Sequence, residues 1–144
     1  MSRVGFDYRR ETVRGETVSR PVARVVLQHL GRTVIFFPYI DSGADVTLIP
    51  RSIGEALGFK LDPGDVQGLS GIGEGRVAVA FKTVRMSIGE HSFDCRIAWA
   101  LIEEVPPLLG RKDVFDRFAV LFREWEGKVF LVPKAEAAAL GIES

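Results

Sequence analysis

A single aspartate, Asp41, lies between two mainly apolar segments and is followed at once by the turn sequence Ser-Gly-Ala. Residues 36–40 before it and 46–49 after it favour burial, so rigid backbone brackets the turn. A carboxylate in such surroundings loses hydration unless it is paired, and such acids are candidates for acid–base chemistry. Gly43 permits close backbone approach and Ala44 leaves the acid uncrowded. The pattern predicts that Asp41 is a functional acid.

The alternative interpretation of Asp41 is an ordinary turn residue, because Asp-Ser-Gly is a common turn sequence. Turns lie in water and usually have polar flanks. The flanks of this turn are apolar on both sides. The three residues alone are a weak signal, whereas the whole segment 40–49 favours the functional interpretation.

Composition limits the classes of protein to which the chain can belong. Its 144 residues predict one folded domain, and a net charge of zero argues against nucleic acid or an anionic membrane as the main partner. We expect a cytoplasmic protein, because the single cysteine allows no intramolecular disulfide and favours a reduced setting. The N-terminal segment shows no apolar stretch typical of a signal peptide, and no segment is apolar enough to span a bilayer. The one cysteine, Cys95, alternates with apolar residues and is predicted to be a buried, reduced side chain, with a reactive thiol as the alternative.

The hydrophobic pattern predicts a mostly β protein with two or three short helices. Residues 1–19 form a polar arm or weak edge strand. A change in the alternating pattern near Lys82 predicts a bulge or bend. The expected strands are 22–28, 33–37, 46–49, 76–88, 93–99, 119–122 and 129–132, and the expected helices are 51–57, 111–118 and 135–140.

Three separated segments together resemble the retropepsin-like aspartic proteases, the homodimeric relatives of the pepsin fold. The first is the segment 40–45 around Asp41, and the second is the glycine-rich 71–73, which looks like the tip of a flap. The third is 108–111, an apolar-apolar-Gly-Arg sequence before an expected helix. The first and third are specific jointly, while glycine-rich hairpin tips are common.

The resemblance implies a role for each matching residue. Asp41 corresponds to the catalytic aspartate, and Ser42 to a hydroxyl that joins two active-site loops across a dimer axis. Asp45 and Arg111 correspond to a pair that buttresses the dimer. The alternative for Arg111 is a solvated residue at the start of a helix. The full set is the active-site loop Ser42, Gly43, Ala44 and Asp45, the flap residues Gly71, Ile72 and Gly73, and the structural residues Leu108, Leu109, Gly110 and Arg111.

The implied activity is peptide hydrolysis by a water molecule activated between two aspartates that share one proton. The sequence contains one Asp-Ser-Gly, so the second aspartate has to be Asp41 of another copy. The implied partners are therefore a second copy of the chain and a peptide or protein substrate, with no nucleic acid, membrane, metal or cofactor.

The implied fold is a retropepsin-like acid protease half-barrel with a glycine-rich flap hairpin. On this interpretation residues 1–19 are an N-terminal arm and 20–144 a single domain, with the family core at about 20–122 and a C-terminal hairpin and helix at 123–144. Both extensions depart from the family, and they leave the dimer interface open. Glu74 adds a charge near the flap tip, where small or apolar residues are more usual.

Other functions have weaker support. The main alternative is a module of the same fold that dimerises or binds extended peptide without catalysis. An unrelated β protein with Asp41 on its surface is a further one. The two histidines do not cluster with other ligands for zinc, and no serine has a recognisable histidine partner. Gly71-Ile72-Gly73-Glu74-Gly75 lacks the helix that a dinucleotide-binding loop precedes.

Overall fold

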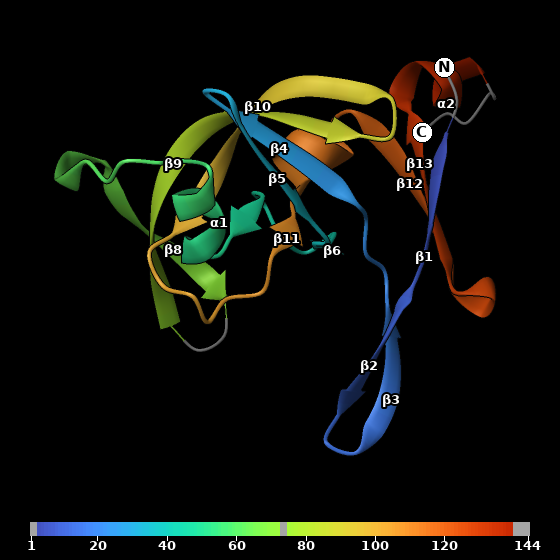
Figure 1. Cartoon of the computed structure of the whole chain (residues 1–144). Coiled ribbons are helices and arrows are strands. Elements are labelled where there is room, and N and C mark those ends of the chain that lie inside the picture. Colours follow the sequence, from blue (N-terminus) through green and yellow to red (C-terminus); the bar gives the residue numbers. More distant parts are fainter. Residues whose placement is uncertain (1–2, 73–74, 140–144) are drawn as a thin grey trace.

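A computed structural model of the chain describes residues 3–72 and 75–139. Within these residues the protein consists mainly of antiparallel strands in three sheets (Figure 1). The largest sheet has the order β5-β4-β9-β10-β7-β11-β6, with β8 paired to β9 outside this path. Its strands are β4 (Val25–His29), β5 (Arg32–Phe36), β6 (Tyr39–Ile40), β7 (Leu48–Ile49), β8 (Val66–Ile72), β9 (Gly75–Ile88), β10 (His91–Ala100) and β11 (Leu108–Leu109).

The three shortest strands determine where the loop of Asp41 lies. β11 pairs in parallel with β6 and antiparallel with β7, so it lies between them. β7 also pairs in parallel with β10, which joins the group to the long strands. Because β6 and β7 are separated by β11, the segment 41–47 that connects them has to cross the end of β11. Two segments far apart in the sequence therefore meet at Asp41.

Most of the core is formed by one large cluster of buried apolar side chains. Two-residue strands such as β7 and β11 have little stability of their own, and burial of each large side chain contributes roughly 1.5–3 kcal/mol. Packing rather than local propensity therefore holds them in place. The fully buried members of this cluster include Val25, Leu27, Ile49, Leu57, Met86, Ile88, Ile97, Leu109, Val114 and Leu131.

The long strand β9 explains the change of pattern near Lys82. Its pairing with β10 is continuous from Val79 to Ile88, so the bulge offered as one explanation does not occur there. Val77 and Val79 pack in a second, smaller cluster, whereas Val84 belongs to the large one. The apolar residues therefore change parity because the two halves of the strand bury opposite faces.

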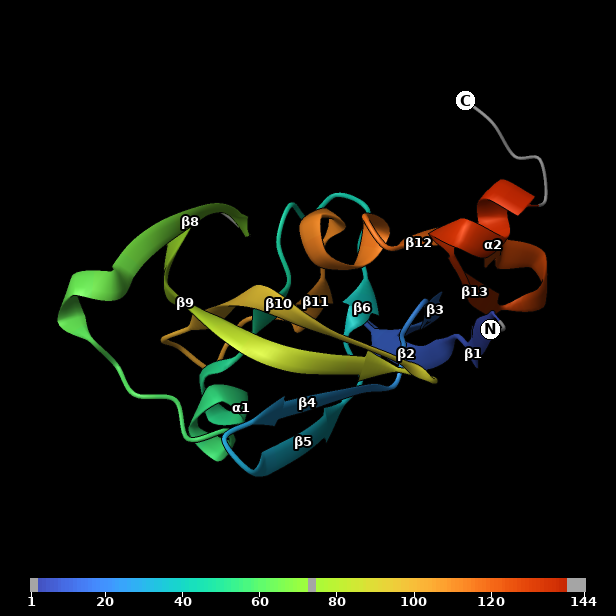
Figure 2. The ribbon, with the colours of Figure 1, turned by 90° about the horizontal axis from the view of Figure 1, so that it is seen from above.

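The N-terminal segment is more ordered than its polar composition predicts. β1 (Val4–Asp7) pairs with β13 (Lys128–Pro133), which also pairs with β12 (Phe118–Arg123), and we call this three-stranded group the terminal sheet. β2 (Arg9–Val13) and β3 (Glu16–Arg20) form a separate hairpin that projects from the body of the protein (Figure 1). The terminal sheet and β8 lie at opposite ends of the molecule (Figure 2).

The helices are short. The first predicted helix is α1 (Arg51–Ala56), held against β10 by a hydrogen bond from Trp99 Nε1–H to the Arg51 carbonyl at 3.0 Å. The predicted helix 111–118 is wrong in its extent. The structure has a π-helical turn, η2 (Arg111–Phe115), which ends at Phe115, and β12 begins at Phe118. The remaining elements are the 3-10 turns η1 (Pro63–Asp65) and η3 (Glu124–Glu126) and the helix α2 (Lys134–Ala139).

Cys95 has the environment that its alternating pattern predicts. Its side chain is buried, and burial raises the pKa of the thiol to about 12. The thiol is therefore protonated at neutral pH, which favours a structural role. Across residues 3–72 and 75–139, none of the helices combines the length and apolar character needed to cross a bilayer.

Candidate active site

Asp41 directly follows β6, and backbone hydrogen bonds fix it from both sides. Its N–H donates to the carbonyl of Leu109 at 3.3 Å, and Ala44 N–H donates to the Asp41 carbonyl at 3.1 Å. The carboxylate Oδ1 accepts from Gly43 N–H at 2.8 Å. These bonds close residues 41–44 as a turn that holds its own carboxylate. Asp41 is half-buried in the single chain, so part of the side chain is open to a ligand or a second chain.

The surroundings of Asp41 bear on the alternative of a simple turn residue. The bond from Gly43 is one that an ordinary turn aspartate also makes. Asp41, however, lines two pockets, and Leu108 lines both of them. One pocket has a volume of about 490 Å³; the other, of about 170 Å³, also includes Leu69 and Ser70 of β8. An acid that opens on two pockets lined in part by apolar side chains can act on a bound molecule.

The segment after β11 is bonded to the loop of Asp41. Arg111 N–H donates to the Ala44 carbonyl at 2.9 Å, and Lys112 N–H to the Asp45 carbonyl at 3.0 Å. The side chains of Arg111 and Asp45 also meet, with 3.9 Å between Nη1 and Oδ1. They are 63% and 79% exposed, so this ion pair stabilises the single chain little. The structure thus brings together the two residues that the resemblance pairs.

Gly110 is the closest point between the two segments. A Cβ atom at this position would overlap the backbone of Val46, so only glycine allows the approach. Gly110 N–H donates to Thr47 Oγ1 at 3.1 Å. Leu109 is fully buried behind the loop, as expected for a core residue. Leu108 is only half-buried, and its place in the lining of both pockets differs from the purely structural role expected for it.

The predicted flap is the hairpin of β8 and β9. Gly71 and Ile72 end β8, while Gly73 lies outside the described residues. The pairing register between β8 and β9 shifts between Leu69 and Ile72, near the end of the paired segment. Ser42 is exposed, and its hydroxyl makes no hydrogen bond within the described part of the chain. Such a hydroxyl is free to bond to another molecule.

Sequence reasoning missed several residues that the structure brings to the site. Leu69 and Ser70, the two residues before Gly71, line the smaller pocket. Their place beside the predicted flap tip was the sequence signal that could have identified them. Thr47 belongs to the apolar segment that follows the Asp41 turn, but most of the other residues have no sequence signal that connects them with Asp41. The missed residues are Glu11, Arg20, Tyr39, Thr47, Leu69, Ser70, Pro106 and Asp113.

Asp113 is a buried acid behind the loop of Asp41. Its side chain is 9% exposed, and its Oδ2 atom has no hydrogen-bond partner. Burial raises the pKa of this carboxyl above its usual value, and hydrogen bonds from the backbone and hydroxyl of Thr47 lower it in part. Arg117 lowers this pKa slightly further. Thr47 thus links Asp113 to Gly110, which connects the turn η2 with the active-site loop.

Asp113 is expected to make stability depend on pH. Because its pKa is raised on folding, the folded protein binds this proton more tightly than the unfolded chain does. The resulting stabilisation is complete below the ordinary aspartate pKa and is lost as the pH rises through the raised value. We therefore expect the free energy of unfolding of the wild type, minus that of Asp113→Asn, to fall as the pH rises.

Urea unfolding from pH 3 to pH 7 measures this difference. Asp65→Asn is the matched control for the loss of one carboxyl group, because Asp65 is exposed in η1. A difference for Asp113→Asn that is flat with pH, or one that rises with pH, would contradict the assignment of the proton to Asp113.

The arrangement of the site defines a class of protein. An aspartate follows a short strand, a glycine-containing return segment is bonded across its loop, and a β-hairpin lies over the pocket; these are the features of a pepsin-type half-site. Among the described residues, no group of three or more histidine, cysteine or acidic side chains is arranged to hold a metal ion.

Comparison with known proteins agrees with this class. The sequence pattern of the family described as Aspartyl protease matches residues 31–112. Among solved structures, a retropepsin-like aspartic protease from Rickettsia conorii is similar with a TM-score of 0.60 and 16% identity, over 91% of this chain and 99% of that one. EIAV protease in complex with the inhibitor HBY-793 is similar with a TM-score of 0.54 and 22% identity, over 67% of this chain and 86% of that one. No curated protein matches the sequence.

The chain belongs to the aspartyl protease family, and its fold is retropepsin-like. Its enzyme class is that of an aspartic-type endopeptidase. The matched range includes the loop of Asp41, the flap hairpin and the segment through Gly110 and Arg111. The resemblance seen in the sequence is thus confirmed at the level of family and fold.

Proposed function

We propose that the chain is an endopeptidase that acts as a homodimer, with Asp41 of each copy forming the catalytic pair. The observation that carries this proposal is the position of Asp41: its backbone is fixed by the bonds to Leu109 and Ala44, and its half-buried carboxylate opens on two pockets. The sequence supplies this loop once, and a second copy of the chain supplies the other. A two-fold axis between the two Asp41 residues makes the site symmetric.

The two carboxylates, roughly 3 Å apart, share one proton because both cannot be ionised at that distance. The ionised aspartate takes a proton from the attacking water, and the protonated one donates a hydrogen bond to the scissile carbonyl. The proton belongs to the pair, so the two residues titrate together. In this scheme Gly43 N–H keeps each Asp41 carboxylate oriented, and Ser42 joins the two loops across the axis.

The substrate is an extended peptide that lies between the loop of Asp41 and the flap hairpin. Leu69 and Ser70 of β8 line the smaller pocket together with Ala44 and Asp45, which supports a substrate in contact with both the hairpin and the loop. An extended peptide pairs with such elements through main-chain hydrogen bonds, and its side chains enter the pockets on alternate sides.

The proposal is tested by measuring particle mass and hydrolysis on the same samples. Sedimentation velocity should give twice the 15.9 kDa chain mass as concentration rises, and cleavage of a peptide library between pH 3 and pH 7 should follow the dimer fraction. A statine-containing peptide, which mimics the tetrahedral transition state, should inhibit cleavage and raise the dimer fraction by mass action. A chain that stays monomeric at high concentration and cleaves nothing would contradict the proposal, and peptide binding without cleavage would favour the non-catalytic alternative.

A further inference from the structure

The β2–β3 hairpin places charged side chains in the larger of the two pockets at Asp41. Glu11 of β2 and Arg20 of β3 line this pocket together with Asp41 itself. The hairpin is held there because Pro21, directly after β3, accepts a hydrogen bond from Ile40 N–H at 3.0 Å. Much of the remaining lining is apolar, including Ile40, Pro106 and Leu108. One wall of an otherwise largely apolar pocket is therefore charged.

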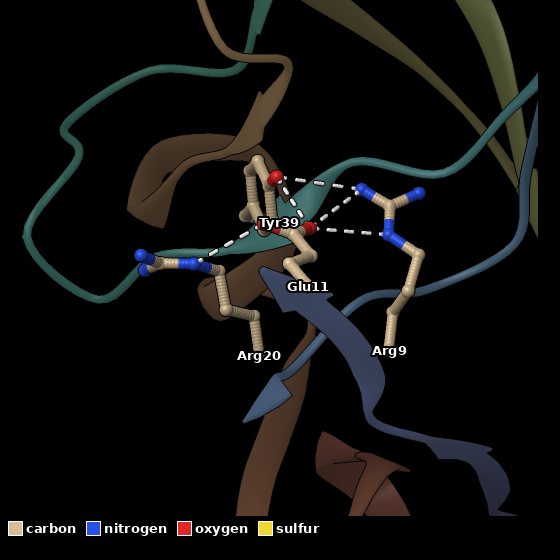
Figure 3. Close-up of polar contacts among 4 residues, drawn as sticks. All are labelled: Arg9, Glu11, Arg20 and Tyr39. Atoms are coloured by element: carbon tan, nitrogen blue, oxygen red, sulfur yellow. Dashed lines mark hydrogen bonds and ion pairs between the residues drawn. The ribbon is translucent and has the colours of Figure 1, made fainter. Parts of the chain in front are cut away.

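Glu11 is fully engaged by groups around it (Figure 3). Its Oε2 atom accepts from the Tyr39 hydroxyl at 2.6 Å and from Arg9 Nε and Nη2 at 3.2 and 3.1 Å. Its Oε1 atom lies 3.3 Å from Arg20 Nε. The hydrogen bond from Tyr39 and those from Arg9 lower the pKa of Glu11, so it is ionised. Both oxygens are occupied, and Glu11 is poorly placed to bind a cation of a substrate.

Arg20 is held in place but keeps donors free. It contacts Glu11 through Nε and lies over the Tyr39 ring, with 6.0 Å from Cζ to the ring centroid. Its terminal Nη atoms point away from both partners (Figure 3), and the described chain provides no hydrogen bond to them. Arg9, in contrast, directs Nε and Nη2 to Glu11. A fixed guanidinium with free terminal nitrogens is well suited to bind a carboxylate.

The charge of this cluster favours an anionic ligand. The cluster of Arg9, Glu11 and Arg20 has two guanidinium groups and one carboxylate, and therefore one net positive charge, although Arg9 bonds to Glu11 without lining the pocket. The other charged group on the lining is Asp41, which in the proposed mechanism shares a proton with its symmetric copy. An acidic side chain of a bound peptide is therefore attracted by Arg20 and repelled by Asp41. Because both residues line the same pocket, we expect this side chain to belong to a peptide residue close to the scissile bond but not in contact with Asp41.

We propose that the β2–β3 hairpin determines substrate specificity, and that Arg20 binds an acidic side chain of the peptide at a residue near the cleaved bond. This inference rests on the proposed function, because it assigns the pocket at Asp41 to the peptide. The apolar lining receives the methylene groups of that side chain, and the free Nη atoms of Arg20 bind its carboxylate.

The test uses the full chain and sets of peptides that differ at one position. Each position on either side of a cleavage site carries glutamate, glutamine or lysine in turn, and kcat/KM is measured for each peptide. At one position at least, glutamate should be preferred over glutamine by about tenfold, as expected for a charge-assisted hydrogen bond in a partly exposed site. Arg20→Gln should reduce this ratio to about one, and Arg20→Glu should shift the preference to lysine.

Arg10→Gln is the matched control. Arg10 lies opposite Ser19 in the hairpin, whereas Arg9 lies opposite Arg20, so the side chain of Arg10 projects from the other face. The Arg10→Gln substitution removes one positive charge from the same hairpin, as Arg20→Gln does, and should leave the glutamate preference intact. Circular dichroism and the Tm of each variant show whether the hairpin substitutions leave the fold intact.

Binding to the Asp41→Asn protein separates this inference from the proposed function. Fluorescence anisotropy with the same peptides measures preference in the absence of hydrolysis. Glutamate preference that depends on Arg20 but occurs without any cleavage by the wild type would support the inference and contradict the endopeptidase. Cleavage with no glutamate preference, a preference that survives Arg20→Gln, or no peptide binding at all would overturn the inference. The inference would also be overturned if Arg20→Gln lowered the dimer fraction and reduced kcat/KM equally for all peptides, because Arg20 would then bind the second copy of the chain.

Discussion

Replacement of Asp41 by asparagine is expected to reduce peptide hydrolysis by about 10²- to 10⁴-fold, the usual contribution of a positioned acid–base group. Asparagine cannot take a proton from water, and both halves of the symmetric site lose the group at once. The fold should not change, because the asparagine Oδ1 atom can still accept the hydrogen bond from Gly43 N–H at 2.8 Å. Tm and particle mass should therefore match those of the wild type, while kcat falls.

Mixing wild-type and Asp41→Asn chains gives a sharper version of this test. If each site needs two Asp41 residues and the chains exchange at random, an equal mixture retains about one quarter of the activity of the same total amount of wild type. If one chain were sufficient, about half would remain. Asp65→Asn, an exposed substitution in η1, controls for dilution and should give full activity in any mixture. A linear decline with the wild-type fraction would exclude a shared site.

The sequence was informative wherever the decisive interactions are local. The Asp41 turn is closed by residues within three positions of it, and the β9–β10 hairpin turns at Gly89, whose φ of 58° favours glycine. The helix predicted after Arg111 failed at its end for a reason that is not local. Phe118 is apolar at helical spacing from Val114, but it pairs with Pro133 in the terminal sheet, and the pattern alone could not reveal that partner.

The rest of the site depends on residues that meet only after folding. Thr47 and Asp113 are 66 positions apart in the chain, and neither carries a sequence signal that names the other. Residues 1–19 were predicted to be a polar arm or weak edge strand, with no connection to the site. In the structure, Glu11 of that arm bonds to Tyr39, beside the site. Arg9 and Glu11, two positions apart, share one face of a strand, and this alternation was the one available hint.

Gly110→Ala is expected to cost about 3 kcal/mol of unfolding free energy, at the upper end of the usual range for overpacking a buried site. The added Cβ would overlap the carbonyl carbon and oxygen of Val46. Backbone atoms cannot rotate away as a side chain can, so the loop of Asp41 and the return segment have to separate. Separation also weakens the bond from Gly110 N–H to Thr47 Oγ1 and those from η2 to Ala44 and Asp45.

Backbone conformation does not contribute to this expected loss. Gly110 has φ of −104° and ψ of 170°, an extended conformation that alanine adopts readily. The loss therefore measures the contact with Val46, and Gly64→Ala is the matched control because a Cβ there meets no atom within 4 Å. Urea unfolding of the two variants should differ by at least about 2 kcal/mol. Equal stabilities would mean that the two segments are not in contact, and Asp41 would then lack the support that holds its carboxylate in position.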